Sequence, residues 1–307
     1  MVPTSQPASS ERLDELLLKT SRTFALSIPV LPQPTRREVT VAYLLFRIAD
    51  TLEDATEWEP SRKLDELDAF GALLRGEPVD AAAGLAARWL EHPPLENPGY
   101  LELLSDLPAV FKAFESLADP ARELVRVHTL RTVERMSDFV RRTRDDRGLE
   151  LTDVDELRDY CYAVAGIVGE MLTELFLVGC PELDSIAGSL RATAARFGEA
   201  LQLVNILKDS ASDANEGRRY LPAAVDREEV FALARGDLDD ARRYVLDLQQ
   251  NGAPHGMVAF TALPVLLARN TLDRVERDGP GAKLTRSEVL GIAHRLDQAL
   301  ACDDPAV

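Results

Sequence analysis

Two stretches of this chain place polar residues at helical spacing inside otherwise apolar sequence. The polar residues recur at steps of three and four, so in a helix each set would share one face. They are Tyr43, Arg47, Asp50 and Asp54 in the first stretch and Gln202, Asn205, Asp209 and Asp213 in the second. The residues between them are mostly Ala, Leu, Ile and Val. A polar stripe on an apolar helix predicts a packed helix that lines a cavity.

Each stripe ends in two aspartates that stand four residues apart. Like charges at this spacing destabilise a helix by roughly 0.2–0.5 kcal/mol, so a counter-ion is expected. Mg²⁺ takes one or two carboxylates, keeps several waters and bridges to substrate phosphates. A solvated helix face is the alternative for either pair alone. Two pairs with polar partners on the same face favour Mg²⁺ bound with a diphosphate.

Helix signals dominate the rest of the chain, and no strand-like alternating run is present. Start and stop signals predict about ten helices, so the fold class is all-α. Asp119-Pro120 predicts a helix over 119–142. Thr285-x-x-Glu288 forms a capping box for the last helix. A long helix is predicted to begin at Thr152 or Asp153, to run to Val178 and to end at Gly179. The stretch 76–99 is predicted to be less regular.

Composition bounds the domain and its partners. With 46% hydrophobic residues, the chain can bury one large core, which we place over 11–303 after a flexible tail at 1–10. The net charge of −17 repels nucleic acid. The most apolar segment, 163–180, contains Glu170 and Glu174, so we expect a buried helix rather than a membrane span. We expect a cytoplasmic protein and leave peripheral membrane contact open.

Three further segments carry candidate chemistry. Ser21-Arg22-Thr23-Phe24 offers phosphate-binding groups and an aromatic face for a cation, or marks a capped helix start. The run from Tyr160 to Gly169 holds small residues at steps of four, which suit either close helix packing or a groove for a long apolar ligand. Its tyrosine is a candidate acid or base, or a buried hydroxyl. The segment 216–222, with Arg218 and Tyr220, is a phosphate-covering loop or a helix-ending turn.

Together these segments resemble the squalene/phytoene synthase family, from Ser21 to about Arg286. The resemblance rests on the two aspartate motifs and on the run Tyr160-Cys-Tyr-Ala-Val-Ala-Gly-Ile-Val-Gly169, in this order. It implies a single-domain isoprenoid-synthase helical bundle around a central cavity. It also implies head-to-head condensation of two allylic diphosphates through a cyclopropylcarbinyl diphosphate.

The resemblance also implies roles for individual residues. The four aspartates, with Asn205, would bind Mg²⁺, and Tyr160 would be catalytic. A further group would contact diphosphate, cation or the polar wall of the site: Ser21, Arg22, Phe24, Tyr43, Arg47, Gln202, Asn205, Arg218 and Tyr220. A prenyl tunnel would be lined by Val164, Ala165, Val168 and Gly169.

Within the family, the first motif, Asp50-Thr-Leu-Glu-Asp54, and the segment from Phe260 to Arg286 resemble bacterial-type squalene synthases. This class condenses farnesyl diphosphate and uses NADPH, for which Lys283 is our candidate contact. Lys208 departs from the family's usual arginine, which keeps the charge but loses the bidentate fork. Phytoene, dehydrosqualene, presqualene diphosphate or hydroxysqualene are alternative products. A non-catalytic helical scaffold is the alternative from another class, and the oligomeric state stays open.

Overall fold

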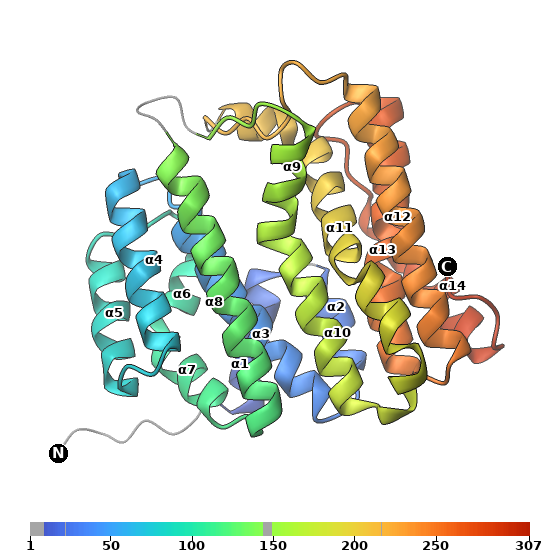
Figure 1. The fold of residues 1–307 in the computed structure, drawn as a ribbon, viewed down its shortest axis with the longest axis horizontal. Coiled ribbons are helices and arrows are strands. Elements are labelled where there is room, and N and C mark those ends of the chain that lie inside the picture. The colour runs from blue at the N-terminus through green and yellow to red at the C-terminus, as the bar shows by residue number, and fades with distance from the viewer. Residues whose placement is uncertain (1–8, 22, 144–148, 216) are drawn as a thin grey trace. The chain divides into compact units, whose positions relative to one another are not determined.

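The computed structural model describes residues 9–21, 23–143, 149–215 and 217–307, which fold into helices with short connections (Figure 1). The described residues form fourteen α-helices, and their isolated β pairing is a bridge between Glu150 and Arg219. The all-α prediction is therefore confirmed. The chain divides into two compact units, which we describe separately. One comprises Met1–Pro29 and Gln33–Arg142, and the other comprises Val30–Pro32 and Thr143–Val307.

The first unit holds eight helices and is built around α3 and α8. The helices are α1 (Ser10–Thr20), α2 (Phe24–Ser27), α3 (Thr35–Glu53), α4 (Pro60–Leu74), α5 (Val79–Glu91), α6 (Pro98–Ser105), α7 (Leu107–Glu115) and α8 (Asp119–Arg142). Helix α8 packs along α3 and α4, while α1 packs on α3 and α6. Leu44, Leu45 and Ile48 of α3 are fully buried. This apolar side fixes α3 in the unit and leaves its polar stripe on the opposite side.

The second unit is built around one long helix, α11. Its helices are α9 (Val154–Cys161), α10 (Ile167–Gly179), α11 (Ala187–Asn215), α12 (Arg227–Gln250), α13 (His255–Asp278) and α14 (Arg286–Ala301). Helix α11 packs along α10, α12 and α13 (Figure 1). Apolar residues of α11 such as Leu203 and Leu207 are fully buried in these contacts. The second predicted stripe therefore belongs to the central helix of this unit.

Two glycines allow α11 and the preceding helix to approach closely. A Cβ atom on Gly169 would stand 2.0 Å from the backbone oxygen of Ala194, and one on Gly198 would stand 2.0 Å from that of Ala165. Carbon and oxygen atoms cannot approach so closely without contact strain, so only glycine fits at either position. The spacing of the two helices thus depends on a glycine from each.

Helices α9 and α10 form one continuous helix, Val154–Gly179, of 26 residues. They are joined by a π-helical turn at Tyr162–Gly166, where the Ile167 amide donates to the carbonyl oxygen of Tyr162. Length and composition would allow this helix to cross a membrane, but 61% of its most apolar window is buried within the protein. The core helix of a globular protein has the same properties, as the sequence predicted.

Several predicted helix boundaries are confirmed. Helix α8 spans Asp119–Arg142, Thr285 and Glu288 form the predicted capping box, and the Asp153 side chain accepts the Glu156 amide at the start of α9. The stretch 76–99 is more regular than predicted, because α5 occupies most of it. Three consecutive alanines favour helix there. Short helices such as α2 and α6 explain why the number exceeds ten.

The predicted ends of the domain lie close to ordered structure. Ser9 caps α1, which begins at Ser10, while residues 1–8 of the predicted tail lie outside the described residues. Beyond 303, the Gln249 side chain donates to the carbonyl oxygen of Asp304 at 2.7 Å and accepts the Ala306 amide at 2.9 Å. The extent of one domain over 11–303 and its central cavity stay predictions.

Candidate active site

The first predicted stripe lies on one side of α3. From Val41 to Asp54, the ten residues between the stripe positions are buried, and Tyr43, Arg47, Asp50 and Asp54 are the partly exposed residues. Helical periodicity alone produces this arrangement, because steps of three and four return to the same face. The stripe therefore lies on the partly exposed side of this part of α3, and the predicted cavity that it would line stays a prediction.

The Arg47 guanidinium connects the members of this stripe. Its Nε donates to the Tyr43 hydroxyl at 3.3 Å, and its Nη1 lies 3.3 Å from Oδ2 of Asp50. It also lies 5.6 Å from the ring centroids of Tyr43 and Tyr100, within the range of cation–π attraction. The negative carboxylate of Asp50 helps to raise the pKa of Arg47 against the opposing effect of burial, so the cation is retained.

The end of α1 joins the same site. The Tyr43 hydroxyl donates to the carbonyl oxygen of Thr20 at 2.8 Å, and the Phe24 ring lies 5.6 Å from that of Tyr43. The Ser21 hydroxyl accepts the Phe24 amide at 2.9 Å, which is the helix-start role that the sequence left open. Arg22, predicted to contact diphosphate, lies outside the described residues.

The acidity of the Asp50 carboxyl group is changed by its surroundings. Its pKa is raised to about 6, mainly by burial; the charge of Arg47 opposes this effect, and the nearby Asp54 carboxylate adds to it. The backbone also ties the two aspartates together, since the Asp54 amide donates to the carbonyl oxygen of Asp50 at 2.8 Å. A carboxylate with this environment is stabilised by an added cation, which is what a metal ligand requires.

The raised pKa of Asp50 predicts that Asp50→Asn stabilises the metal-free protein at neutral pH. The ordinary value is 3.8 and the folded value is about 6, so the folded state binds protons more tightly. Its contribution to stability is therefore present at low pH and is lost as the pH rises through about 6. Asparagine mimics the neutral form and should raise the free energy of unfolding at pH 8 by on the order of 1–3 kcal/mol.

Thermal unfolding in EDTA between pH 5 and pH 8 measures this effect. The advantage of Asp50→Asn should grow with pH and be smallest at pH 5. An advantage that is equal at all pH values, or a loss of stability at pH 8, would contradict the assignment.

The second stripe lies near the end of α11 and is paired with a lysine. The Lys208 ammonium lies 3.1 Å from Oδ1 of Asn205 and 3.1 Å from Oδ2 of Asp209. Gln202 is partly exposed on the same helix. A cation thus already stands beside two of the predicted metal ligands, at the position where the sequence departs from the family pattern.

Tyr160 and Tyr220 meet in the second unit. Their hydroxyls are 3.1 Å apart, and their rings stack with centroids 4.6 Å apart. The bridge between Glu150 and Arg219 fixes the segment that carries Tyr220, and the Arg218 amide donates to the carbonyl oxygen of Asp213 at 2.8 Å. The structure therefore brings the candidate catalytic tyrosine together with the 216–222 segment, which starts beside the second aspartate motif.

The small residues after Tyr160 serve close helix packing. Gly169 directs its missing side chain at the α11 backbone rather than into a tunnel, and the Ala165 carbonyl faces Gly198. The packing alternative thus accounts for Gly169, whereas the Ala165 side chain is partly exposed and its place in a prenyl tunnel stays a prediction. Val164 and Val168 are partly exposed and stand four residues apart, so their place in a prenyl tunnel stays a prediction.

A network of ion pairs that joins α9, α11 and α12 was not predicted. Arg158 on α9 lies 3.1 Å from Glu199 of α11 and 3.5 Å from Asp237 of α12, and Arg196 lies 2.9 Å from Asp237. Burial raises the pKa of Glu199 despite the opposing charge of Arg158. In the sequence, the members of this network are single charged residues on three different helices. Helical spacing relates residues of one helix only, so it could not indicate that these charges meet.

The loop that carries Lys283 is attached to the second stripe. The Gly281 amide donates to the carbonyl oxygen of Lys208 at 2.7 Å, and Arg274 donates to that of Lys283 at 3.3 Å. Lys283 itself is exposed. An exposed cation on a loop fixed beside Asp209 suits a phosphate contact, which is the role predicted for it.

The aspartates suit a metal that arrives with its ligand. Among the described residues, no cluster of three or more His, Cys, Asp or Glu side chains could hold a metal ion by itself. Each motif offers two carboxylates, and Mg²⁺ commonly uses one or two together with waters and substrate phosphates. The donor set and the raised pKa of Asp50 fit such a metal site.

Comparison with known proteins agrees with this architecture. A family model described as Squalene/phytoene synthase matches residues 17–230. The solved structure of TcSQS in complex with the ligand BPH1237 superposes with a TM-score of 0.71 at 24% identity, covering 92% of this chain and 84% of that chain. The likeness to that structure shows the fold.

Two curated relatives have similar sequences. The squalene synthase of Schizosaccharomyces pombe is 26% identical over 97% of this chain and 67% of its own length. The bifunctional lycopene cyclase/phytoene synthase of Colletotrichum graminicola is 33% identical over 69% of this chain and 34% of its own length. This chain thus spans about two thirds of the first relative and one third of the second.

Proposed function

This chain belongs to the squalene/phytoene synthase family, and we propose that it condenses two farnesyl diphosphates head to head to squalene, through presqualene diphosphate, with Mg²⁺ and NADPH. The observation that carries the proposal is the partly exposed stripe of α3, where Arg47 and two aspartates stand among buried residues of the same helix. A guanidinium beside carboxylates that favour a counter-ion is suited to binding a diphosphate together with its metal ion.

The proposed residues divide between the diphosphate and the carbon chain. Asp50, Asp54, Asp209 and Asp213, with Asn205, would hold Mg²⁺, which when bound neutralises charge on the leaving diphosphate. The Arg47 fork would bind diphosphate oxygens as the allylic C–O bond breaks and its electron pair leaves with the diphosphate. The Phe24 ring would present its π face to the allylic cation.

Tyr160 is proposed to act at the reacting carbons. Its hydroxyl lies beside that of Tyr220, so it can pass or accept a proton through this hydrogen bond as the cyclopropane ring forms. Its ring is buried, which keeps water from the cation and prevents capture as an alcohol. The network of Arg158, Glu199 and Asp237 holds α9 against α11 and α12 and so fixes this tyrosine.

NADPH is proposed as the hydride donor for the second half-reaction. Lys283 is the residue that would contact a phosphate of the dinucleotide. It is exposed, and the backbone of its loop is hydrogen-bonded to that of Lys208 in the second aspartate motif. We place the reaction in the cytoplasm, with the membrane surface as the place where the apolar product leaves.

One incubation tests the proposal. Purified protein is given farnesyl diphosphate and Mg²⁺, with or without NADPH, and the hydrocarbons, alcohols and diphosphates are identified by mass spectrometry. With NADPH we expect squalene, and without it presqualene diphosphate or rearranged alcohols. The same product under both conditions would refute the reductive step, and no consumption of farnesyl diphosphate would refute the substrate.

A second product class is favoured by the fungal relative. The similarity to a bifunctional lycopene cyclase/phytoene synthase at 33% identity leaves phytoene as the leading alternative. The same incubation with geranylgeranyl diphosphate separates the two proposals. Preferred consumption of the longer substrate, with no effect of NADPH, would replace squalene by phytoene as the proposed product.

A further inference from the structure

We propose that Tyr100 is a positioning residue that holds the Arg47 guanidinium in place for diphosphate binding. Tyr100 lies on α6, outside both aspartate motifs and outside every segment that the sequence singled out. The inference rests on the proposed function, since it assigns Arg47 a diphosphate ligand.

The first observation is the contact itself. The Arg47 guanidinium lies 5.6 Å from the centre of the Tyr100 ring, and Tyr43 and Asp50 contact it from its own helix. Tyr100 is therefore the partner in this group that comes from a different helix. A contact from a second element restricts the guanidinium in a direction that residues of α3 do not.

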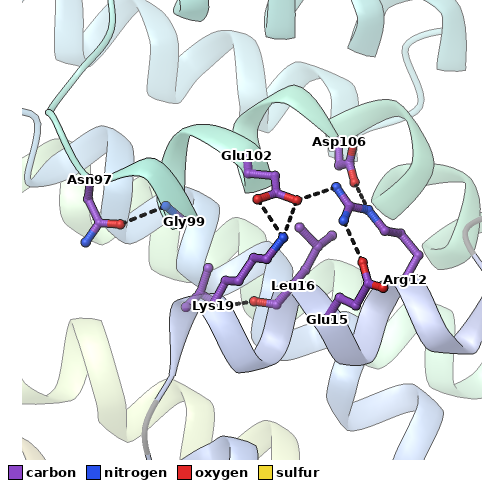
Figure 2. A network of polar contacts seen from close by, with 9 residues as sticks. Arg12, Glu15, Leu16, Lys19, Asn97, Gly99, Glu102 and Asp106 are labelled. Carbon is purple, nitrogen blue, oxygen red and sulfur yellow. Dashed lines mark hydrogen bonds and ion pairs between the residues drawn. The ribbon is translucent and has the colours of Figure 1, made fainter.

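The second observation is that α6 is fixed against α1 by charged side chains (Figure 2). Glu102 accepts from the Lys19 ammonium at 2.7 and 2.8 Å, and Arg12 pairs with Glu102 and Asp106. At the start of α6, the Asn97 side chain accepts the amides of Gly99 and Tyr100. The backbone that carries Tyr100 is therefore held by both a helix cap and ion pairs.

The third observation is a close backbone approach at Gly99. A Cβ atom there would stand 2.6 Å from the Lys19 carbonyl oxygen, so glycine allows the start of α6 to reach the end of α1. The next residue of α1, Thr20, accepts the Tyr43 hydroxyl. One turn of α1 thus contacts both α6 and the stripe of α3, and this places Tyr100 beside Arg47.

The geometry matters because arginine binds phosphate through a planar fork. The guanidinium carries five N–H donors, and Nε and Nη1 are directed at Tyr43 and Asp50. A fixed plane presents the other donors in one orientation, so less side-chain entropy is lost when a diphosphate binds. Removal of the Tyr100 ring should release this restriction and weaken diphosphate binding.

The test compares Tyr100→Leu and Tyr100→Phe with Leu101→Ala, a truncation of a similarly half-buried neighbour on α6. Calorimetry measures the Kd for inorganic pyrophosphate in Mg²⁺, and kinetics measure kcat and KM for farnesyl diphosphate. Tyr100→Leu should raise both the Kd and the KM by about five- to thirty-fold, which corresponds to a cation–π contact of about 1–2 kcal/mol. Tyr100→Phe keeps the ring and should restore the affinity to within about threefold.

The outcomes separate this inference from the proposed function. Equal pyrophosphate affinity in wild type, Tyr100→Leu and Leu101→Ala would overturn the role of Tyr100. A wild-type protein that binds no pyrophosphate in Mg²⁺ would instead overturn the proposed function. A purely structural role would lower the melting temperature without changing the Kd of the folded protein. Tyr100→Gln, which also lacks the ring, provides the same test if Tyr100→Leu fails to fold.

Discussion

Replacing Asp50 or Asp213 by asparagine should reduce turnover of farnesyl diphosphate by about a hundred- to a thousandfold. Loss of one group that stabilises developing charge at a reacting centre typically costs this much in kcat. Asparagine keeps the size of the side chain, and the Asp213 backbone oxygen that accepts the Arg218 amide is unchanged. The loss should therefore arise from weaker metal binding and not from unfolding.

Steady-state rates over a Mg²⁺ titration, together with circular dichroism, check this prediction. Asp68→Asn is a suitable control, because Asp68 is also helical in the first unit but its side chain is 85% exposed. It should keep the wild-type rate. If Asp50→Asn or Asp213→Asn keeps the wild-type rate at low Mg²⁺, the metal assignment is wrong.

Replacing Gly169 or Gly198 by alanine should destabilise the protein strongly. In each case the new Cβ atom would meet a backbone oxygen at 2.0 Å, and backbone cannot move aside as a flexible side chain can. The two helices would have to separate, and overpacking of this kind costs about 1–3 kcal/mol or more. Gly169→Leu should cost more than Gly169→Ala, because it adds volume at the same contact.

Urea unfolding of the purified variants measures this cost. Gly236→Ala is the matched control, because Gly236 is in the middle of α12 and a Cβ atom there would meet nothing within 4 Å. This substitution should stabilise the protein by about 0.5–1 kcal/mol through helix propensity. A Gly169→Ala variant as stable as the wild type would show that the helices do not need this close contact.

Local signals in the sequence predicted much of the helical structure. Asp119-Pro120, the Thr285 capping box and Asp153 each fix a helix end through contacts within four residues, so their sequence spacing is sufficient. The π-helical turn at Tyr162–Gly166 was not predicted, because its residues Tyr-Ala-Val-Ala-Gly include no charged side chain that would mark a change of helix face. Its local sequence gives no separate signal.

The candidate site was predictable where it lies on one helix. Tyr43, Arg47 and Asp50 meet because helical spacing alone places them together. Tyr100 reaches Arg47 only through the packing of α6 on α1, and Gly198 opposes Ala165 only through the packing of α11. Such contacts join residues of different helices whose separation along the sequence follows no regular spacing. They depend on tertiary structure, so a sequence pattern does not reveal them.

The wide turn at Tyr162–Gly166 also changes which way the two halves of its helix face, because it rotates one half about the helix axis relative to its position in a regular α-helix. Each residue advances an α-helix by about 100°, so one residue in excess of the regular pitch rotates everything before it relative to everything after it. The chain can therefore direct Tyr160 at Tyr220 while Gly169, nine positions later, still faces Ala194. Nine regular steps would place Gly169 about 180° around the helix axis from Tyr160, whereas a turn that takes up one extra residue leaves the two about 80° apart.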